Sequence, residues 1–188
     1  NKSKKFVIIV GAGIKYNSSF KTVTKLAEYL NVPIVTAAGH GDAIPNDHKL
    51  NSGQMGPRGN PVATNLMKEA DTILALGTRL GFNSTFYSYE NINKKAKIIQ
   101  VELEKKMIGK YFPVSIGILA DAATVAIQLL KALKQKKISS DTKEWTKKFI
   151  NDRKKFLVNR DKIKLNNNLI QPNALFKELR RVLPKNSA

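Results

Sequence analysis

The chain has 188 residues, of which 42% are hydrophobic and 25% charged, a composition typical of a globular protein with one main core. It contains no cysteine, which excludes disulfides, thiolate nucleophiles and cysteine-based zinc sites and suits a reducing compartment such as the cytoplasm. No apolar run approaches the roughly 18 residues that a membrane-spanning helix needs, so we expect no membrane contact.

The formal net charge is +19, and residues 134–188 alone contain 16 basic and 5 acidic residues. A strongly basic chain can bind nucleic acid by neutralising phosphates. Lysines on the solvated faces of helices, in a sequence that is rich in Lys, Asn and Ile throughout, explain the charge more simply. We therefore do not expect nucleic acid as a partner.

The first predicted element is a buried strand over Phe6–Val10, a β-branched apolar run that stops at a Gly-Ala-Gly turn. An amphipathic helix over Ser18–Leu30 follows, because apolar residues recur there at spacings of three and four. A second strand, Pro33–Thr36, leads into a polar, glycine-rich stretch over Ala37–Asn60. This stretch has no clear period, so we interpret it as a long loop, which is usually functional or mobile.

A helix over Pro61–Ala70 is predicted next, with Asn60 as its N-cap and proline at its first position. Three further strands are predicted over Thr72–Leu76, Lys97–Leu103 and Val114–Leu119. A long helix then opens at Asp121. Strands that alternate with helices predict a parallel sheet covered on both faces, which is a Rossmann-like three-layer α/β domain. Such sheets bind ligands at the carboxyl ends of their strands.

Beyond Leu133 the sequence becomes basic and helical. A long helix carries Trp145, Phe149 and Phe156, and a last helix runs over Ala174–Leu183. This segment has few apolar residues, so we expect its Trp and Phe side chains to pack against a neighbouring domain. We therefore divide the chain into a nucleotide-binding type of domain, residues 1–133, and a basic helical linker, residues 134–188.

Candidate binding residues lie where the predicted strands end. The turn Gly11-Ala12-Gly13 allows a backbone to approach a phosphate, but Tyr16 stands where a dinucleotide fingerprint has its third glycine, so a plain tight turn fits equally well. Gly77-Thr78-Arg79 places a hydroxyl and a guanidinium just after a strand, where a diphosphate can receive a bidentate contact. A surface arginine in a polar loop is the alternative.

Two acidic residues follow the later strands. Glu102 ends a strand and is suited to accept hydrogen bonds from ribose hydroxyls. Asp121 either does the same or, as we prefer, caps the helix that it precedes. The two histidines, His40 and His48, share one loop without a third ligand at helical spacing, so we predict neither a catalytic nor a metal site and expect both to be solvated.

Several motifs in order carry a resemblance to a known family. They are Gly11-Ala12-Gly13, Val32-Pro33-Ile34-Val35-Thr36, Asp42-Ala43-Ile44-Pro45-Asn46-Asp47-His48, Gly56-Pro57-Arg58-Gly59-Asn60-Pro61, Leu76-Gly77-Thr78-Arg79-Leu80, Lys97-Ile98-Ile99-Gln100-Val101-Glu102, Ile108-Gly109-Lys110 and Asp121-Ala122. In this order and spacing they resemble the central domain of the acetolactate synthase-like thiamine diphosphate enzymes, a group that includes sulfoacetaldehyde acetyltransferase and oxalyl-CoA decarboxylase.

The resemblance implies a three-domain enzyme that acts on 2-keto acids or related carbonyl compounds by decarboxylation, carboligation or acyl transfer. Its first and third domains, which lie outside this chain, bind thiamine diphosphate and Mg²⁺ and supply the catalytic glutamate across the interface of a homodimer or homotetramer. The central domain is expected to have a six-stranded parallel sheet that holds FAD, ADP or nothing. The linker would lead into the third domain.

The ligand contacts that the resemblance implies are Gly11, Gly13, Thr36, Ala37, Arg58, Gly77, Thr78, Arg79, Glu102 and Asp121. The chain departs from the flavin-containing synthases after Arg79, where Leu80-Gly81-Phe82-Asn83 replaces an aromatic residue, two aspartates and a second arginine. This departure argues against flavin and leaves a purely structural domain open. A flavin- or adenine-nucleotide-binding electron-transfer module is the alternative to a thiamine diphosphate enzyme.

Overall fold

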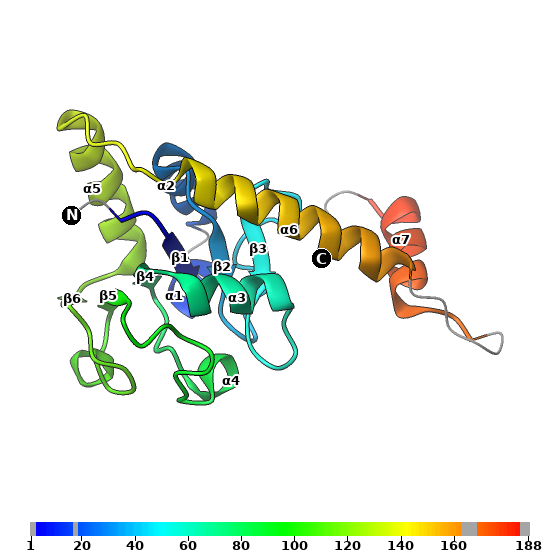
Figure 1. The fold of residues 1–188 in the computed structure, drawn as a ribbon, viewed down its shortest axis with the longest axis horizontal. Helices are drawn as coiled ribbons and strands as arrows, with labels where there is room; N and C mark the ends of the chain where they lie inside the picture. The colour runs from blue at the N-terminus through cyan, green and yellow to red at the C-terminus, as the bar shows by residue number, and fades with distance from the viewer. Residues whose placement is uncertain (1–2, 17–18, 163–168, 185–188) are drawn as a thin grey trace. The chain divides into compact units, whose positions relative to one another are not determined.

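Six parallel strands form one sheet in the part of the chain that the computed structural model describes, residues 3–16, 19–162 and 169–184. The strand order is β3-β2-β1-β4-β5-β6, so the expected six-stranded parallel sheet is confirmed (Figure 1). The strands are β1 (Phe6–Val10), β2 (Ile34–Thr36), β3 (Asn51–Gln54), β4 (Thr72–Leu76), β5 (Lys97–Glu102) and β6 (Ile116–Leu119).

Helices flank this sheet in a three-layer arrangement (Figure 1). The helical segments are α1 (Ala12–Lys15), α2 (Phe20–Leu30), α3 (Pro61–Glu69), α4 (Phe82–Thr85), the 3₁₀ turn Lys105–Met107, α5 (Ala122–Gln135), α6 (Lys143–Lys162) and α7 (Pro172–Val182). The helix predicted to start at Ser18 is α2, and Ser18 itself lies outside the described residues. The chain divides into two units, Asn1–Asp152 and Arg153–Ala188.

The core lies on both sides of β1 and β4, where alternate side chains point to opposite faces of the sheet. On one face, Ile8 and Leu74 join a buried cluster with residues of α2 and α5, including Leu26 and Ala126. On the other face the intervening residues are buried as well, and Met67 of α3 is also fully buried. Burial on both faces explains the nearly continuous apolar sequence of these strands.

Two helix starts are fixed by side-chain caps, as predicted. Asn60 Oδ1 accepts a hydrogen bond from Ala63 N at 2.9 Å at the start of α3. Asp121 Oδ1 accepts one from Thr124 N at 2.8 Å at the start of α5. Each cap occupies a backbone donor that the first turn of a helix leaves without a partner.

Strand β3 lies inside the stretch over Ala37–Asn60 that we predicted as a loop, so that prediction was wrong at this point. The strand has a polar sequence and no alternation of apolar residues. Its buried polar groups are satisfied instead, because Ser52 Oγ donates to Ile34 O at 2.7 Å and Asn51 Nδ2 donates to Pro45 O at 3.0 Å. Side-chain hydrogen bonds thus take the place of hydrophobic burial in this edge strand.

The start of α6 belongs to the first unit, and the expectation that its aromatic residues pack against another domain was wrong for two of them. Trp145 is 5% exposed and Phe149 is 1% exposed within this chain. Trp145 Nε1 donates to Phe6 O at 3.1 Å, and both side chains line a small cleft against α3. The sequence did not reveal this contact because α3 and α6 are far apart along the chain.

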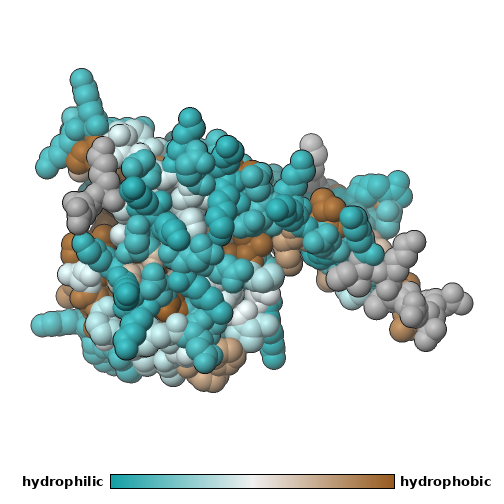
Figure 2. All heavy atoms as spheres, viewed as in Figure 1, coloured by the Kyte–Doolittle hydropathy of each residue, from teal (hydrophilic) through white to brown (hydrophobic). Residues whose placement is uncertain are grey.

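Polar residues cover the solvent side of the first unit. Figure 2 shows hydrophilic residues over most of its visible face. On α6, Lys143 and Lys147 are exposed, and Lys148 forms an ion pair with Glu69 at 3.0 Å. Among the described residues, no helix combines the length and the apolar character needed to cross a bilayer.

The described residues of the second unit include α7, which has a strongly amphipathic sequence but no buried residue. Leu175, Phe176, Leu179 and Val182 are exposed apolar residues of this helix.

Candidate functional site

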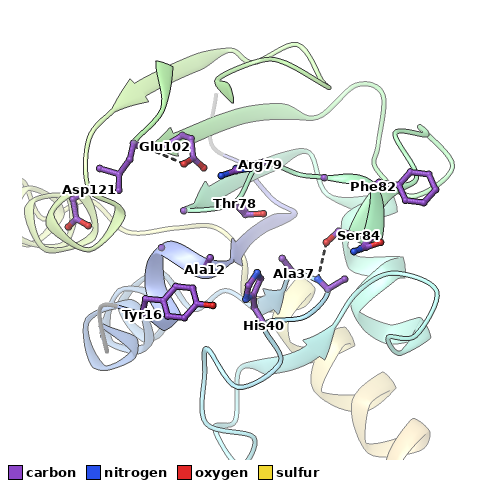
Figure 3. Close-up of a pocket in the computed structure, with 16 residues that line it drawn as sticks. Ala12, Tyr16, Ala37, His40, Thr78, Arg79, Phe82, Ser84, Glu102 and Asp121 are labelled. Carbon is purple, nitrogen blue, oxygen red and sulfur yellow. Dashed lines mark hydrogen bonds between the residues drawn. The ribbon is translucent and has the colours of Figure 1, made fainter. Parts of the chain in front are cut away.

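A cavity of about 620 Å³ lies at the carboxyl ends of the central strands (Figure 3). Its walls come from the segments that follow β1, β2, β4 and β5 and from the residue before α5. The lining residues are Ala12, Gly13, Tyr16, Ala37, Ala38, His40, Gly77, Thr78, Arg79, Gly81, Phe82, Asn83, Ser84, Glu102, Leu103 and Asp121. Seven of the ten predicted contacts are therefore brought together here.

The glycines at one wall of the cavity are needed because two turns touch there. A Cβ atom on Gly77 would lie 2.6 Å from Gly13 Cα, and Gly77 has a φ of 60°. Gly11 is buried beneath the cavity, where a Cβ atom would lie 2.7 Å from Gly77 O. The amides of Gly11 and Gly13 donate to Leu76 O and Gly77 O, both at 3.2 Å. The lack of side chains on these glycines therefore leaves room for a ligand, but the amides of Gly11 and Gly13 are not available to donate hydrogen bonds to it.

The segment after β4 is held rigidly and presents one cation. Thr78 is buried, its Oγ1 accepts a hydrogen bond from Leu80 N at 3.3 Å, and its carbonyl accepts one from Gln100 Nε2 at 3.2 Å. Arg79 is exposed between these fixed neighbours and its side chain lies along the cavity (Figure 3). A guanidinium in this position can bind a phosphate through two parallel hydrogen bonds.

The acidic residues lie on the side of the cavity nearest α5 (Figure 3). Glu102 Oε1 accepts a hydrogen bond from Leu103 N at 3.2 Å at the end of β5. Asp121 caps α5, which is the role that we preferred for it. It also lines the cavity. Carboxylates at this end of a nucleotide-binding sheet are suited to ribose hydroxyls.

Three predicted contacts lie outside the cavity lining. Gly11 is buried beneath the cavity, and Thr36 is fully buried in β2. Arg58 is exposed in the glycine-rich loop before α3. In the same loop, a Cβ atom on Gly56 would lie 2.4 Å from Asn83 O, so the loop packs against the backbone of α4 rather than facing the cavity.

His40 is a lining residue that the sequence reasoning missed. Its Nδ1 atom is buried without a hydrogen-bond partner among the described residues, which costs about 1–3 kcal/mol for a buried polar atom. Burial, and then the charge of Lys15, hold the pKa of His40 below its usual range, while Asp42 opposes them. Its position in the segment that follows β2, four residues after the strand ends, was the signal that could have revealed it. His48, by contrast, lies outside the lining, with Nε2 at 3.4 Å from Glu28 Oε1.

An aromatic cluster, Phe82, Phe86, Tyr87 and Tyr111, lies beside the cavity. The Tyr87 and Tyr111 rings stack with centroids 4.3 Å apart, and Phe82 meets Phe86 edge to face at 5.1 Å. Only Phe82 reaches the cavity lining. Phe86 and Tyr87 both adopt left-handed backbone conformations, with φ of 52° and 54°, which is a strained arrangement for aromatic residues.

Within residues 3–16, 19–162 and 169–184, no three His, Cys, Asp or Glu side chains gather as metal ligands. The lining of the cavity instead combines glycine turns, one guanidinium and two carboxylates, which suits the phosphates and hydroxyls of a nucleotide.

Comparison with known proteins adds the family. A family model described as the central domain of thiamine pyrophosphate enzymes matches residues 1–133. The chain is 38% identical over 140 residues to sulfoacetaldehyde acetyltransferase of Roseovarius nubinhibens, covering 73% of this chain and 23% of that protein. It is 30% identical over 145 residues to the acetolactate synthase large subunit of Corynebacterium glutamicum, covering 77% of this chain and 23% of that protein.

A third relative extends the similarity into the C-terminal helices. The probable acetolactate synthase large subunit of Methanocaldococcus jannaschii is 28% identical over 182 residues, covering 97% of this chain and 30% of that protein. The chain therefore spans about a quarter of the length of the relatives that it matches. With the family model matched over most of its length, the chain belongs to the thiamine pyrophosphate enzyme family, in which it corresponds to the central domain.

Proposed function

We propose that this domain binds an adenine nucleotide, ADP or FAD, in the cavity at the strand ends. The observation that supports the proposal is the arrangement of the walls, with Arg79 after β4 and Glu102 and Asp121 toward α5. Arg79 would hold the diphosphate, and the two carboxylates would accept hydrogen bonds from the ribose. The contact between Gly13 and Gly77 would keep the wall free of side chains where the diphosphate lies.

We further propose that the whole protein is a thiamine-diphosphate-dependent enzyme acting on 2-keto acids or related carbonyl compounds. The names of the relatives, an acetyltransferase and acetolactate synthase subunits, support this class of reaction. Thiamine diphosphate with Mg²⁺ would supply the carbanion chemistry from other domains. The described residues of this chain do not fit that cofactor, because they gather no carboxylate cluster for its metal.

In the whole enzyme this domain would separate the two catalytic domains and keep them at a fixed distance. Its partners would be those domains and a second copy of the protein, as a homodimer or homotetramer. We also propose a cytoplasmic location, with which a chain that lacks cysteine is compatible. Conversion of pyruvate by the isolated chain would contradict this assignment, because no catalytic residue is assigned to it.

Calorimetric titration of the purified chain with ADP and with FAD tests nucleotide binding. We expect micromolar affinity for at least one of them, and a loss of about tenfold or more in Arg79→Ala, because a charge-assisted bidentate contact contributes about 1.5–3 kcal/mol. Arg58→Ala is the matched control, since Arg58 is exposed outside the cavity lining and should leave the affinity unchanged. Absence of binding to both nucleotides would instead indicate a purely structural domain.

A further inference from the structure

His40 stands on the wall of the cavity that is formed by the segments after β1 and β2. Figure 3 shows its ring between Tyr16 and Ala37, on the opposite side of the cavity from Arg79. A diphosphate held by Arg79 would therefore face His40. The imidazole is the one ring on this wall that can change its charge near neutral pH.

The hydrogen-bonding groups around His40 favour a contact with a ligand. The amides of Gly11 and Gly13 on this wall already donate within the fold, so they are not available to a phosphate. His40 Nδ1, however, is buried without a partner among the described residues. Nδ1 itself is shielded from solvent, so a ligand group in the cavity would contact the part of the imidazole ring that lines the cavity.

The charges around His40 determine its protonation. Lys15 Nζ lies 2.9 Å from Asp42 Oδ2, and this ion pair sits beside the imidazole. The other titratable groups of the cavity lining are Tyr16, Arg79, Glu102 and Asp121. Burial and the Lys15 charge lower the pKa of His40, so its imidazole is neutral near pH 7 before a ligand binds. An anion placed against the ring acts in the opposite direction and favours the protonated form.

We propose that His40 binds the diphosphate of the nucleotide from the wall opposite Arg79, and that it takes up one proton from solvent as the nucleotide binds. This inference rests on the proposed nucleotide-binding function. The imidazolium then donates a charge-assisted hydrogen bond to a phosphate oxygen. His40 thereby makes the occupancy of the domain dependent on pH, in a chain whose other histidine lies outside the cavity lining.

The pH dependence of binding tests the proposal. The probe is ADP-ribose, because its bridging diphosphate has no group that titrates near neutral pH. A group whose pKa rises on binding favours the complex below its pKa in the free protein, and this gain is lost as the pH rises through its pKa in the complex. A rise of one unit makes the affinity up to about tenfold higher at a pH below the pKa of His40 in the free protein than at a pH above its pKa in the complex, so the titration covers a wide pH range on both sides of neutrality.

Two variants assign the effect to His40. In His40→Asn an amide replaces the ring near the position of Nδ1 but does not titrate, so the affinity should vary less than about twofold over the same range. In His48→Asn the affinity should vary as in the unmodified chain, because His48 lies near Glu28 outside the cavity lining. Calorimetry in buffers of different ionisation enthalpy should also show proton uptake that is absent in His40→Asn.

Histidine NMR distinguishes the two ways in which the experiment can fail. The chain has two histidines, so the two variants assign both ring signals. Arg79-dependent binding of ADP-ribose with an unchanged His40 pKa and a flat pH profile would overturn the His40 inference and leave nucleotide binding intact. No heat with ADP-ribose or ADP at any pH, together with unchanged signals for both rings, would overturn both proposals.

Discussion

At the scale of single residues, the shape of the cavity depends on a close contact between the backbones of Gly13 and Gly77. Gly13 N donates to Gly77 O at 3.2 Å, and each glycine stands where a Cβ atom on the other would collide. This contact joins the turn after β1 to the turn after β4 and brings Arg79 to the edge of the cavity. Glycine is therefore required at both positions by the fold itself.

Replacement of Gly77 by alanine should therefore destabilise the domain. The new Cβ atom would lie 2.6 Å from Gly13 Cα in a left-handed conformation, and we expect a loss of about 2 kcal/mol or more in the free energy of unfolding. Gly41→Ala is the control, because its nearest neighbour is a side-chain atom at 3.5 Å, and it should change stability by less than about 0.5 kcal/mol. Urea unfolding followed by circular dichroism measures both, and equal effects would contradict the argument.

Asp71 directly precedes β4 and binds the residues directly before β1. It therefore links the amino-terminal ends of these two strands, at the end of the sheet away from the cavity. Its carboxylate accepts hydrogen bonds from Ser3 Oγ, from Lys4 N at 2.9 Å and from Lys5 N at 3.0 Å. Burial by itself raises the pKa of Asp71, but these hydrogen bonds outweigh it, so the pKa lies below its usual range. A carboxyl whose pKa is lowered by folding stabilises the folded state above its unfolded pKa, and this contribution is lost as the pH falls through the folded pKa.

Asp71→Asn should thus be less stable than the unmodified chain at neutral pH, by about 1 kcal/mol after allowance for solvent screening. The difference should shrink as the pH falls through the folded-state pKa of Asp71, where the carboxyl becomes protonated in the folded chain as well. Asp47→Asn, at an exposed loop position, should show little difference at either pH. Urea unfolding at several pH values provides the measurement, and a difference for Asp71→Asn that does not depend on pH would exclude this mechanism.

At the scale of elements, the start of α6 closes the first unit. Trp145 donates to Phe6 O, and the ammonium groups of Lys5 and Lys148 each lie 5.6 Å from its ring centroid. Both ammonium groups also pair with Glu69 of α3, at 3.6 Å and 3.0 Å. The helix is therefore held by one buried aromatic residue, Trp145, and by exposed ion pairs around it. Burial of the aromatic ring contributes most of the stabilisation, because exposed ion pairs contribute little.

Trp145→Ala should lower the free energy of unfolding by about 3–5 kcal/mol, the range for removing a large buried aromatic side chain. Ile150→Ala on the same helix is the control, because Ile150 is 46% exposed and should lose less than about 1 kcal/mol. Circular dichroism at increasing urea concentration measures both variants without relying on tryptophan fluorescence. Similar losses in the two would show that α6 does not depend on Trp145.

At the scale of the whole molecule, the net charge is +19, and the basic residues that the structure describes are distributed along the chain, with Arg79 alone among them in the cavity lining. The cavity lining contains one arginine and two acidic residues, so the bulk charge does not explain it. Basic surfaces attract polyanions, but attraction without base or phosphate contacts fails as salt screens it.

We accordingly expect the chain to bind duplex DNA weakly at low ionic strength and to release it at physiological salt. A fluorescence anisotropy titration at several salt concentrations measures this, with a steep fall in affinity and no preference among sequences. Binding that persists at physiological salt would instead support a nucleic-acid function.

A yellow purified protein with a flavin spectrum would favour FAD over ADP as the ligand.

The sequence by itself determined the layered fold, because the strands β1 and β4 are continuous apolar runs and the helices between strands have a clear period. It also predicted Gly77, Arg79 and Glu102 at the ends of strands, and the structure places these three residues in the lining of one cavity. Only the tertiary structure revealed β3, His40 and the packing of Trp145. Each depends on side-chain partners or burial against segments distant in sequence, and no local pattern of hydrophobicity encodes such contacts.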